Sequence, residues 1–229
     1  MADLEAYSKL IENFKDKSIH KKRVIETTKC QFKLFKKQAR VLADKMTADL
    51  GADDGIEVSY TSKGKYEFEM RFGEDVLLFL LHTDVFDFDK NHRMWKRPYV
   101  KEDRNRAFCG MISVFNFLKT SFEMNRSDDI GYLIGRVFIN EENRFFVEGN
   151  RQLGYLYRDF SESNLDEEAM KSILISAIDY CNEFDLLTPP FSSMAQLQVG
   201  QVLDYTTKMK LQTGKRLGFQ LSWDKENPE

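Results

Sequence analysis

The sequence predicts an α+β fold, with a mostly antiparallel sheet of about seven to nine strands flanked by N-terminal and C-terminal helices. Two observations lead to this prediction. Apolar residues recur at every third or fourth position in the first 50 residues and again after residue 164, which is the spacing of a helix with one buried face. Between these regions, apolar and polar residues alternate, which is the spacing of a half-buried strand. Helices and strands in separate runs favour this fold over a parallel, doubly wound one.

The first helical region is predicted to form two helices, over residues 3–15 and 18–50, because Ser18 can cap the start of the second. Gly51 and the turn that follows it end the second helix. The apolar face predicted for the longer helix consists of Ile25, Thr28, Phe32, Phe35, Ala39, Leu42 and Met46.

Two pairs of strands are predicted to form hairpins. Residues 56–61 and 66–72 alternate between apolar and charged or polar side chains on either side of a polar turn. Residues 136–139 and 144–147 are short apolar runs on either side of the polar turn Asn140–Asn143. These hairpins indicate a sheet built from neighbouring antiparallel strands.

Four further segments are predicted to be strands. The unbroken apolar run at 76–81 indicates a central strand buried on both faces. Residues 107–118 fit either a strand or a buried helix, and their β-branched side chains favour the strand. Alternating apolar residues predict two more strands, at 153–157 and 217–223.

The C-terminal part is predicted to hold two helices, at 165–184 and 193–211. Asn164 and Glu167 have the spacing of a capping pair at the start of the first helix. Two consecutive prolines separate it from the second.

The chain is long enough to bury a substantial core without disulfide or metal cross-links. We expect one α+β domain over residues 1–229. The segment 89–106, with ten charged residues among eighteen, could instead be a long exposed loop that joins subdomains 1–88 and 107–229. The 19 phenylalanines predict an aromatic-rich core or an apolar binding surface.

The composition predicts a cytoplasmic protein that does not enter the membrane. Three widely spaced cysteines form no CxxC pair, and their odd number favours reduced, buried thiols. The first residues are polar and do not resemble a signal peptide. The longest apolar run has six residues, whereas a membrane helix needs about 20.

Catalysis has little support in the sequence. It contains no GxGxxG, GxxxxGK[ST], HExxH or GxSxG motif, which excludes the usual phosphate-binding loops, zinc proteases and serine hydrolases. A histidine-based mechanism would have to use His20, His82 or His92. We therefore expect no cofactor, apart from the divalent metal considered below.

A basic strip on the long N-terminal helix gives the leading functional hypothesis. Residues 15–40 contain ten Lys+Arg and two acids, although the whole chain carries a formal net charge of −3. Five of these basic residues fall within a wedge of about 60° on a helix, away from its apolar face. The strip consists of Lys22, Lys29, Lys33, Lys36 and Arg40. Its charge predicts a non-enzymatic binding module for an acidic macromolecule, either a nucleic acid or a protein.

A cluster of acids and histidines supports an alternative, a metal-dependent phosphodiester hydrolase. Carboxylates suit Mg²⁺ or Mn²⁺, and an added histidine suits Zn²⁺ or Fe²⁺. The candidate ligands are His82, Asp84, Asp87, Asp89 and His92. On a straight strand these side chains would point to both faces, so a metal site needs a twist or bulge there.

Arginines next to aromatic residues form a second candidate anion site, because guanidinium groups can bind phosphate and stack on rings. The residues are Arg136, Arg144, Arg151, Arg158, Tyr155 and Tyr157. Pairing of these arginines with nearby acids on a solvated face is the alternative. A third functional hypothesis is a dimerising, chaperone-like or structural subunit, which makes a homo-oligomer a further expectation.

Overall fold

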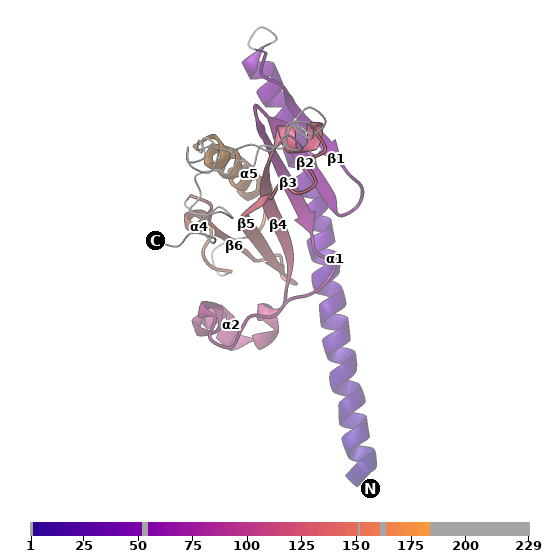
Figure 1. Ribbon diagram of the computed structural model, residues 1–229. Coiled ribbons are helices and arrows are strands. Elements are labelled where there is room, and N and C mark those ends of the chain that lie inside the picture. Colours follow the sequence, from indigo (N-terminus) through magenta and orange to yellow (C-terminus); the bar gives the residue numbers. More distant parts are fainter. Residues whose placement is uncertain (1, 52–54, 151, 161–163, 184–229) are drawn as a thin grey trace, which may run out of the picture.

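The computed structural model describes residues 2–51, 55–150, 152–160 and 164–183. Its fold is α+β, as predicted, and one six-stranded antiparallel sheet contains its strands (Figure 1). The strand order in space equals the order in the chain, from β1 to β6, so each strand pairs with the next one. The strands are β1 (Val58–Ser62), β2 (Glu67–Phe72), β3 (Asp75–Leu81), β4 (Cys109–Leu118), β5 (Tyr132–Asn140) and β6 (Phe145–Gly149).

Two single strands and one hairpin of the prediction are confirmed. The run at 76–81 is β3, which lies between β2 and β4 near the middle of the sheet, although Leu78 and Leu80 are half-buried rather than buried. The ambiguous segment 107–118 contains β4. The hairpin around Asn140–Asn143 joins β5 and β6, with Ile139 opposite Phe145.

The strand count of about seven to nine is wrong for the described part of the chain, which holds six strands. Residues 153–157 were predicted to be a strand, but Leu153–Leu156 form a short helix, α4. The chain folds back so closely over the end of β6 that a Cβ at Gly154 would collide with the Gly149 carbonyl oxygen. Only Tyr157 still pairs with the sheet, since its carbonyl accepts a hydrogen bond of 2.7 Å from the Val147 amide. The predicted helix at 193–211 and strand at 217–223 lie outside the described residues.

The two predicted N-terminal helices are one continuous helix, α1 (Ala2–Leu50). Ser18 does not cap a new helix, because neither glycine nor proline interrupts the sequence around it and the helical hydrogen bonds continue. At 1.5 Å per residue, α1 is about 73 Å long. Its second half packs on the sheet, while its first half extends beyond it (Figure 1).

The main core lies between the sheet and two helices, α1 and α5 (Glu167–Asn182). On α1 the predicted residues Thr28, Phe32, Phe35 and Ala39 are buried. The rings of Phe68 on β2 and Phe79 on β3 stack with centroids 4.4 Å apart. This confirms the aromatic-rich core.

The start of α5 differs from the prediction. Its cap is Asp166, whose carboxylate accepts a 2.8 Å hydrogen bond from the Ala169 amide. The predicted capping pair of Asn164 and Glu167 places the helix start two residues too early, since Asn164 lies in a bridge with Arg144. Asp166 has the required spacing to the amide three residues later, so it takes the capping role.

A second apolar layer covers the other face of β4, β5 and β6. The charged segment 89–106, predicted as an exposed loop, instead forms short helical turns and contributes Met94 and Val100 to this layer. These turns are η1 (Arg93–Lys96), α2 (Pro98–Glu102) and η2 (Arg104–Ala107). The layer consists of Met94, Val100, Ala107, Cys109, Met111, Phe138, Phe146 and Phe160. Met94 and Val100 are buried and Trp95 and Tyr99 are half-buried, whereas most charged side chains of the segment are exposed. The polar composition of the segment hid these apolar contacts.

Two findings concern the predicted compartment. Within the described ranges, no helix is long and apolar enough to cross a membrane. Cys109 and Cys181 are buried as predicted, whereas Cys30 on α1 is exposed, so the prediction of buried thiols is wrong there.

Candidate functional site

The basic strip lies on a side of α1 that does not pack on the sheet. Lys22, Lys33 and Arg40 are exposed, and Lys29 is half-buried. Arg40 lies 4.0 Å from Asp44 on the next turn of the helix, a weak contact between two exposed side chains. Lys22, Lys29 and Lys33 make no ion pair with another described residue. Three of the five positive charges are therefore not neutralised by a neighbouring acid within the described part.

Lys36, the fifth residue of the strip, is engaged in the fold. Its ammonium donates to Ser62 Oγ at 3.1 Å and to the Gly64 carbonyl in the turn between β1 and β2. It also lies 5.1 Å from the centre of the Phe32 ring. Burial lowers the pKa of Lys36, and the charge of Glu67 partly opposes this. Lys36 thus holds the turn against α1. The accessible strip comprises the other four residues, of which Lys29 is half-buried.

Near the N-terminal end of the strip, a network of ion pairs joins α1 to the turn between β5 and β6. His20 Nδ1 contacts the carboxylate of Glu141, and His20 Nε2 lies 2.9 Å from the carbonyl oxygen of Asn105. Arg23 donates to the same carboxylate at 3.1 Å. Sequence reasoning missed this contact because Glu141 is 118 residues from Arg23. These contacts engage two basic groups of α1, His20 and Arg23, which are therefore not part of the free basic strip.

The same turn is tied to the second apolar layer by Tyr99. Its hydroxyl donates to Glu142 at 2.7 Å and accepts from the Asn140 amide at 2.8 Å. Burial is the main cause that raises the pKa of Tyr99 to about 12. The hydrogen bond from Tyr99 is the largest of the causes that lower the pKa of Glu142, and Arg106 adds to it. This network positions the turn.

The candidate metal ligands are dispersed along the segment that leaves β3. His82 Nε2 lies 3.1 Å from Ser113 Oγ on β4, and Asp84 is exposed. Asp87 accepts a hydrogen bond from the Phe88 amide at 2.8 Å. Asp89 accepts one from the Asn91 amide at 2.9 Å, so both acids stabilise local turns.

His92, the last candidate ligand, faces a different partner. Its ring stacks on Phe88 with centroids 4.5 Å apart, and its Nε2 lies 3.3 Å from Glu148 on β6. Among the residues that the structure describes, no group of three His, Cys, Asp or Glu side chains is arranged to hold a metal ion. The geometry there provides no assembled hydrolase site.

The candidate arginine site is divided between the two faces of the sheet. Arg136 on β5 donates to Glu148 on β6 at 2.5 Å, on the face of the second apolar layer. Tyr157 packs on Phe145 in the main core, on the opposite face, with ring centroids 4.6 Å apart. These two members of the set therefore cannot contact the same ligand.

The remaining members of that set also have separate surroundings. The guanidinium of Arg158 lies 4.6 Å from the centre of the Tyr155 ring, so these two exposed residues pair with each other. Arg144 is half-buried beside Asn164, and Arg151 lies outside the described residues. The alternative interpretation, in which arginines pair with nearby acids, holds for Arg136.

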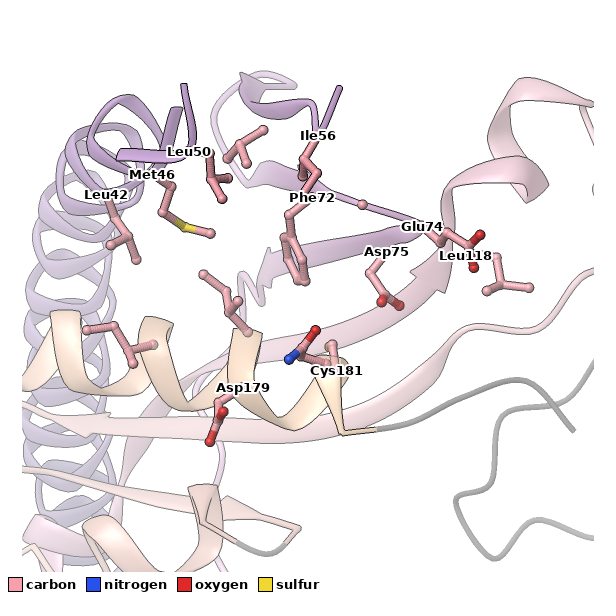
Figure 2. Close-up of a pocket in the computed structure, with 15 residues that line it drawn as sticks. Leu42, Met46, Leu50, Ile56, Phe72, Glu74, Asp75, Leu118, Asp179 and Cys181 are labelled. Carbon is pink, nitrogen blue, oxygen red and sulfur yellow. The ribbon is translucent and has the colours of Figure 1, made fainter. Parts of the chain in front are cut away.

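An apolar groove that the sequence did not reveal lies between α1, α5 and the ends of β1–β4 (Figure 2). It encloses about 680 Å³. In Figure 2, Leu42, Met46 and Leu50 of α1 lie on one side, and Ile56 and Phe72 lie on the other. Further apolar lining residues are Val58, Leu118, Ile175, Ile178 and Cys181.

The rim of this groove is acidic. Glu74 and Asp75 at the start of β3 and Asp179 on α5 line it, whereas none of the lining residues that the structure describes is a lysine or arginine. Asp75 accepts a 2.9 Å hydrogen bond from the Asn116 amide, which fixes its carboxylate. The predicted apolar faces of both helices contain some of these residues, but no sequence pattern shows that two such faces leave a space between them.

Comparison of this chain with protein-family models, with curated proteins and with solved structures gave no match. The functional argument therefore depends on the described surfaces alone: a basic strip on α1 and an acid-rimmed apolar groove.

Proposed function

We propose that this protein is a non-enzymatic binding module that recognises an acidic macromolecule through the exposed basic strip of α1. The observation that supports the proposal is that Lys22, Lys29 and Lys33 lie on one side of a rigid helix without an acidic partner among the described residues. Charges that are not neutralised within a fold attract a polyanion and release its counterions on binding. For the alternative of a metal-dependent hydrolase, the described residues offer no assembled group of metal ligands.

The strip makes a quantitative prediction about salt. Four contacts, from Lys22, Lys29, Lys33 and Arg40, should give a slope of log affinity against log salt of about −3.6 on duplex DNA and about −2.8 on a single strand. Replacing Lys22, Lys29 and Lys33 together with glutamine should reduce the duplex slope by about 2.7. Fluorescence anisotropy with labelled DNA, RNA and heparin at several salt concentrations measures this slope.

The matched control replaces Lys90, Lys101 and Lys171 with glutamine, since these exposed lysines change the net charge equally but lie elsewhere. The control should keep the wild-type slope. An equal reduction of the slope in both variants, or no salt-dependent binding by the wild type, would refute the proposal that the strip binds a polyanion. An acidic peptide that binds while nucleic acids do not would identify the partner as a protein.

The acid-rimmed groove supports a second candidate function, the binding of an amphipathic segment that carries lysine or arginine beside its apolar side chains. The apolar lining suits leucine, isoleucine or methionine, and Glu74, Asp75 and Asp179 suit flanking basic groups. This occupant would be part of a partner protein, bound as a helix in a groove.

A labelled Leu/Lys peptide tests the groove directly. Ile175 is an exposed groove residue, so replacing it with lysine should weaken peptide binding by about 10-fold or more, because it removes apolar contact area and adds repulsion. Ile130→Lys makes the same chemical change at an exposed site outside the groove and should leave the affinity unchanged. Equal affinities of both variants would exclude the groove as the binding site.

A further inference from the structure

The first turns of α1 carry an apolar face that nothing in the described structure covers. Leu4, Tyr7, Leu10 and Phe14 are 77%, 62%, 61% and 69% exposed. The helix extends beyond the sheet and α2 here (Figure 1), and from residue 4 to residue 19 only Ile11 is partly covered. We name residues 2–15 of α1 the overhang.

The exposed residues of the overhang form one stripe. At about 100° per residue, Leu4, Tyr7, Leu10, Ile11 and Phe14 lie within a wedge of about 120°. Positions 4, 7, 11 and 14 follow the three-four spacing of a coiled-coil seam over two heptads. An isolated helix surface of this kind favours another helix as its partner.

The direction of the stripe restricts how a partner can lie on it. Counted around the helix, the stripe overlaps the buried face formed by Val24, Thr28 and Phe32, so it points to the side of α1 on which the sheet packs. A second copy that ran parallel to α1 along the stripe would meet the segment 93–107 and the sheet. A copy that runs antiparallel extends away from them, and the two folded bodies then lie at opposite ends.

The charge of the helix also favours an antiparallel second copy. Residues 4–12 contain Glu5 and Glu12 with one lysine, whereas residues 15–23 contain five Lys+Arg with one aspartate. Antiparallel pairing over residues 4–14 places the two basic sections at opposite ends of the paired region, where they do not face each other. Parallel pairing would place the two basic sections side by side, with like-charge repulsion.

We infer that this protein self-associates through its overhangs, which pair as antiparallel helices with Leu4 opposite Phe14 and Tyr7 opposite Ile11 of the second copy. This register maximises the overlap of two stripes that both run from residue 4 to residue 14. Five apolar side chains from each chain, at roughly 100 Å² each, bury about 1,000 Å² in total, which is near the lower limit for a specific interface. The dimer is therefore concentration-dependent, with a dissociation constant in the micromolar range.

Sedimentation equilibrium of the full chain, from about 1 µM to about 300 µM, tests the association. The average mass should rise from one chain to two within this range. Phe14→Glu should weaken the dimer at least about 10-fold, since it puts a charge in the stripe. Asn13→Glu, which makes an equal charge change on the adjacent, non-stripe side, should leave it intact. A single-chain mass at every concentration, or equal effects of both variants, would overturn the inference.

Cross-linking tests the antiparallel register. In a Cys30→Ser background, which removes the exposed native thiol, Leu4→Cys and a tagged Phe14→Cys chain are mixed and oxidised. Antiparallel pairing predicts disulfides between the two different chains. The two copies of position 4 would lie about 15 Å apart along the helix, too far for a disulfide. Preferred cross-links between identical chains would overturn the antiparallel arrangement.

Discussion

Replacing Phe146 with alanine is expected to destabilise the protein by about 3–5 kcal/mol, and replacing Phe145 should cost a similar amount. Adjacent strand residues point to opposite faces, and in most sheets with one wet face only one of the two would matter. Here both rings are fully buried, because β6 is covered on both sides. Phe145 packs in the main core, and Phe146 stacks on Phe138 with centroids 4.8 Å apart in the second apolar layer.

Urea denaturation at fixed protein concentration measures both costs as changes in the free energy of unfolding. Ile130→Ala is the control, since this side chain is 74% exposed and its loss should cost under about 0.5 kcal/mol. A large cost for Phe145→Ala together with a cost under about 1 kcal/mol for Phe146→Ala would mean that the charged segment 89–106 does not build a true second layer.

Gly110→Ala is expected to destabilise the protein by about 1–3 kcal/mol or more, because it pushes α1 away from β4. A Cβ at this position would lie within 2.7 Å of Thr28 Cβ, closer than van der Waals contact allows. Thr28 cannot easily move, since it is buried and its hydroxyl donates to the Val24 carbonyl at 2.7 Å. Alanine normally suits a strand better than glycine, so the predicted sign depends on this close approach.

A double-mutant cycle separates the collision from other effects of the substitution. Thr28→Ala removes two of the three colliding atoms, Oγ1 and Cγ2, which the added Cβ would meet at 2.2 and 2.7 Å. The double variant Gly110→Ala/Thr28→Ala should therefore recover about 1–2 kcal/mol relative to the sum of the single changes. Gly135→Ala is the control: it is also buried in the sheet, but its Cβ would meet its nearest atoms at 3.5 Å and should cost less. Additive costs in the cycle would show that the helix does not approach β4 as closely as the structure describes.

Much of the fold follows from local patterns in the chain. Alternating apolar residues predicted the first hairpin, because side chains on a strand point to its two faces in turn. Short unbroken apolar runs predicted the hairpin around Asn140–Asn143 and the central β3. The spacing of Phe32, Phe35 and Ala39 predicted the buried face of α1 for the equivalent reason in a helix. The number of helices in the first 50 residues was not predictable from Ser18, since a capping residue permits a helix start but does not force one.

The candidate sites, like the fold, combine features that local sequence predicts with features that depend on tertiary contacts. The positions of the basic residues on α1 were readable from sequence, because a helix fixes the relative direction of every side chain on it. The sequence could not predict the contact of Lys36 with the turn at Ser62 and Gly64, because this contact depends on how the hairpin packs against α1. The dispersal of His82 and His92 was also undetermined, because the segment leaves the strand after Leu81 and each histidine finds a different neighbour.

The sequence by itself determined the fold class, the antiparallel hairpins and the positions of the basic residues on the first helix, all of which depend on residues within a few turns or one hairpin of each other. Only the tertiary structure decided the second apolar layer, the acid-rimmed groove and the uncovered stripe of the overhang. These features depend on where separate elements stop covering one another. The lengths of α1, α5 and the strands, and the way they cross, decide which surfaces are covered. An apolar side chain is buried in the core or stays exposed according to whether a distant part of the chain reaches it.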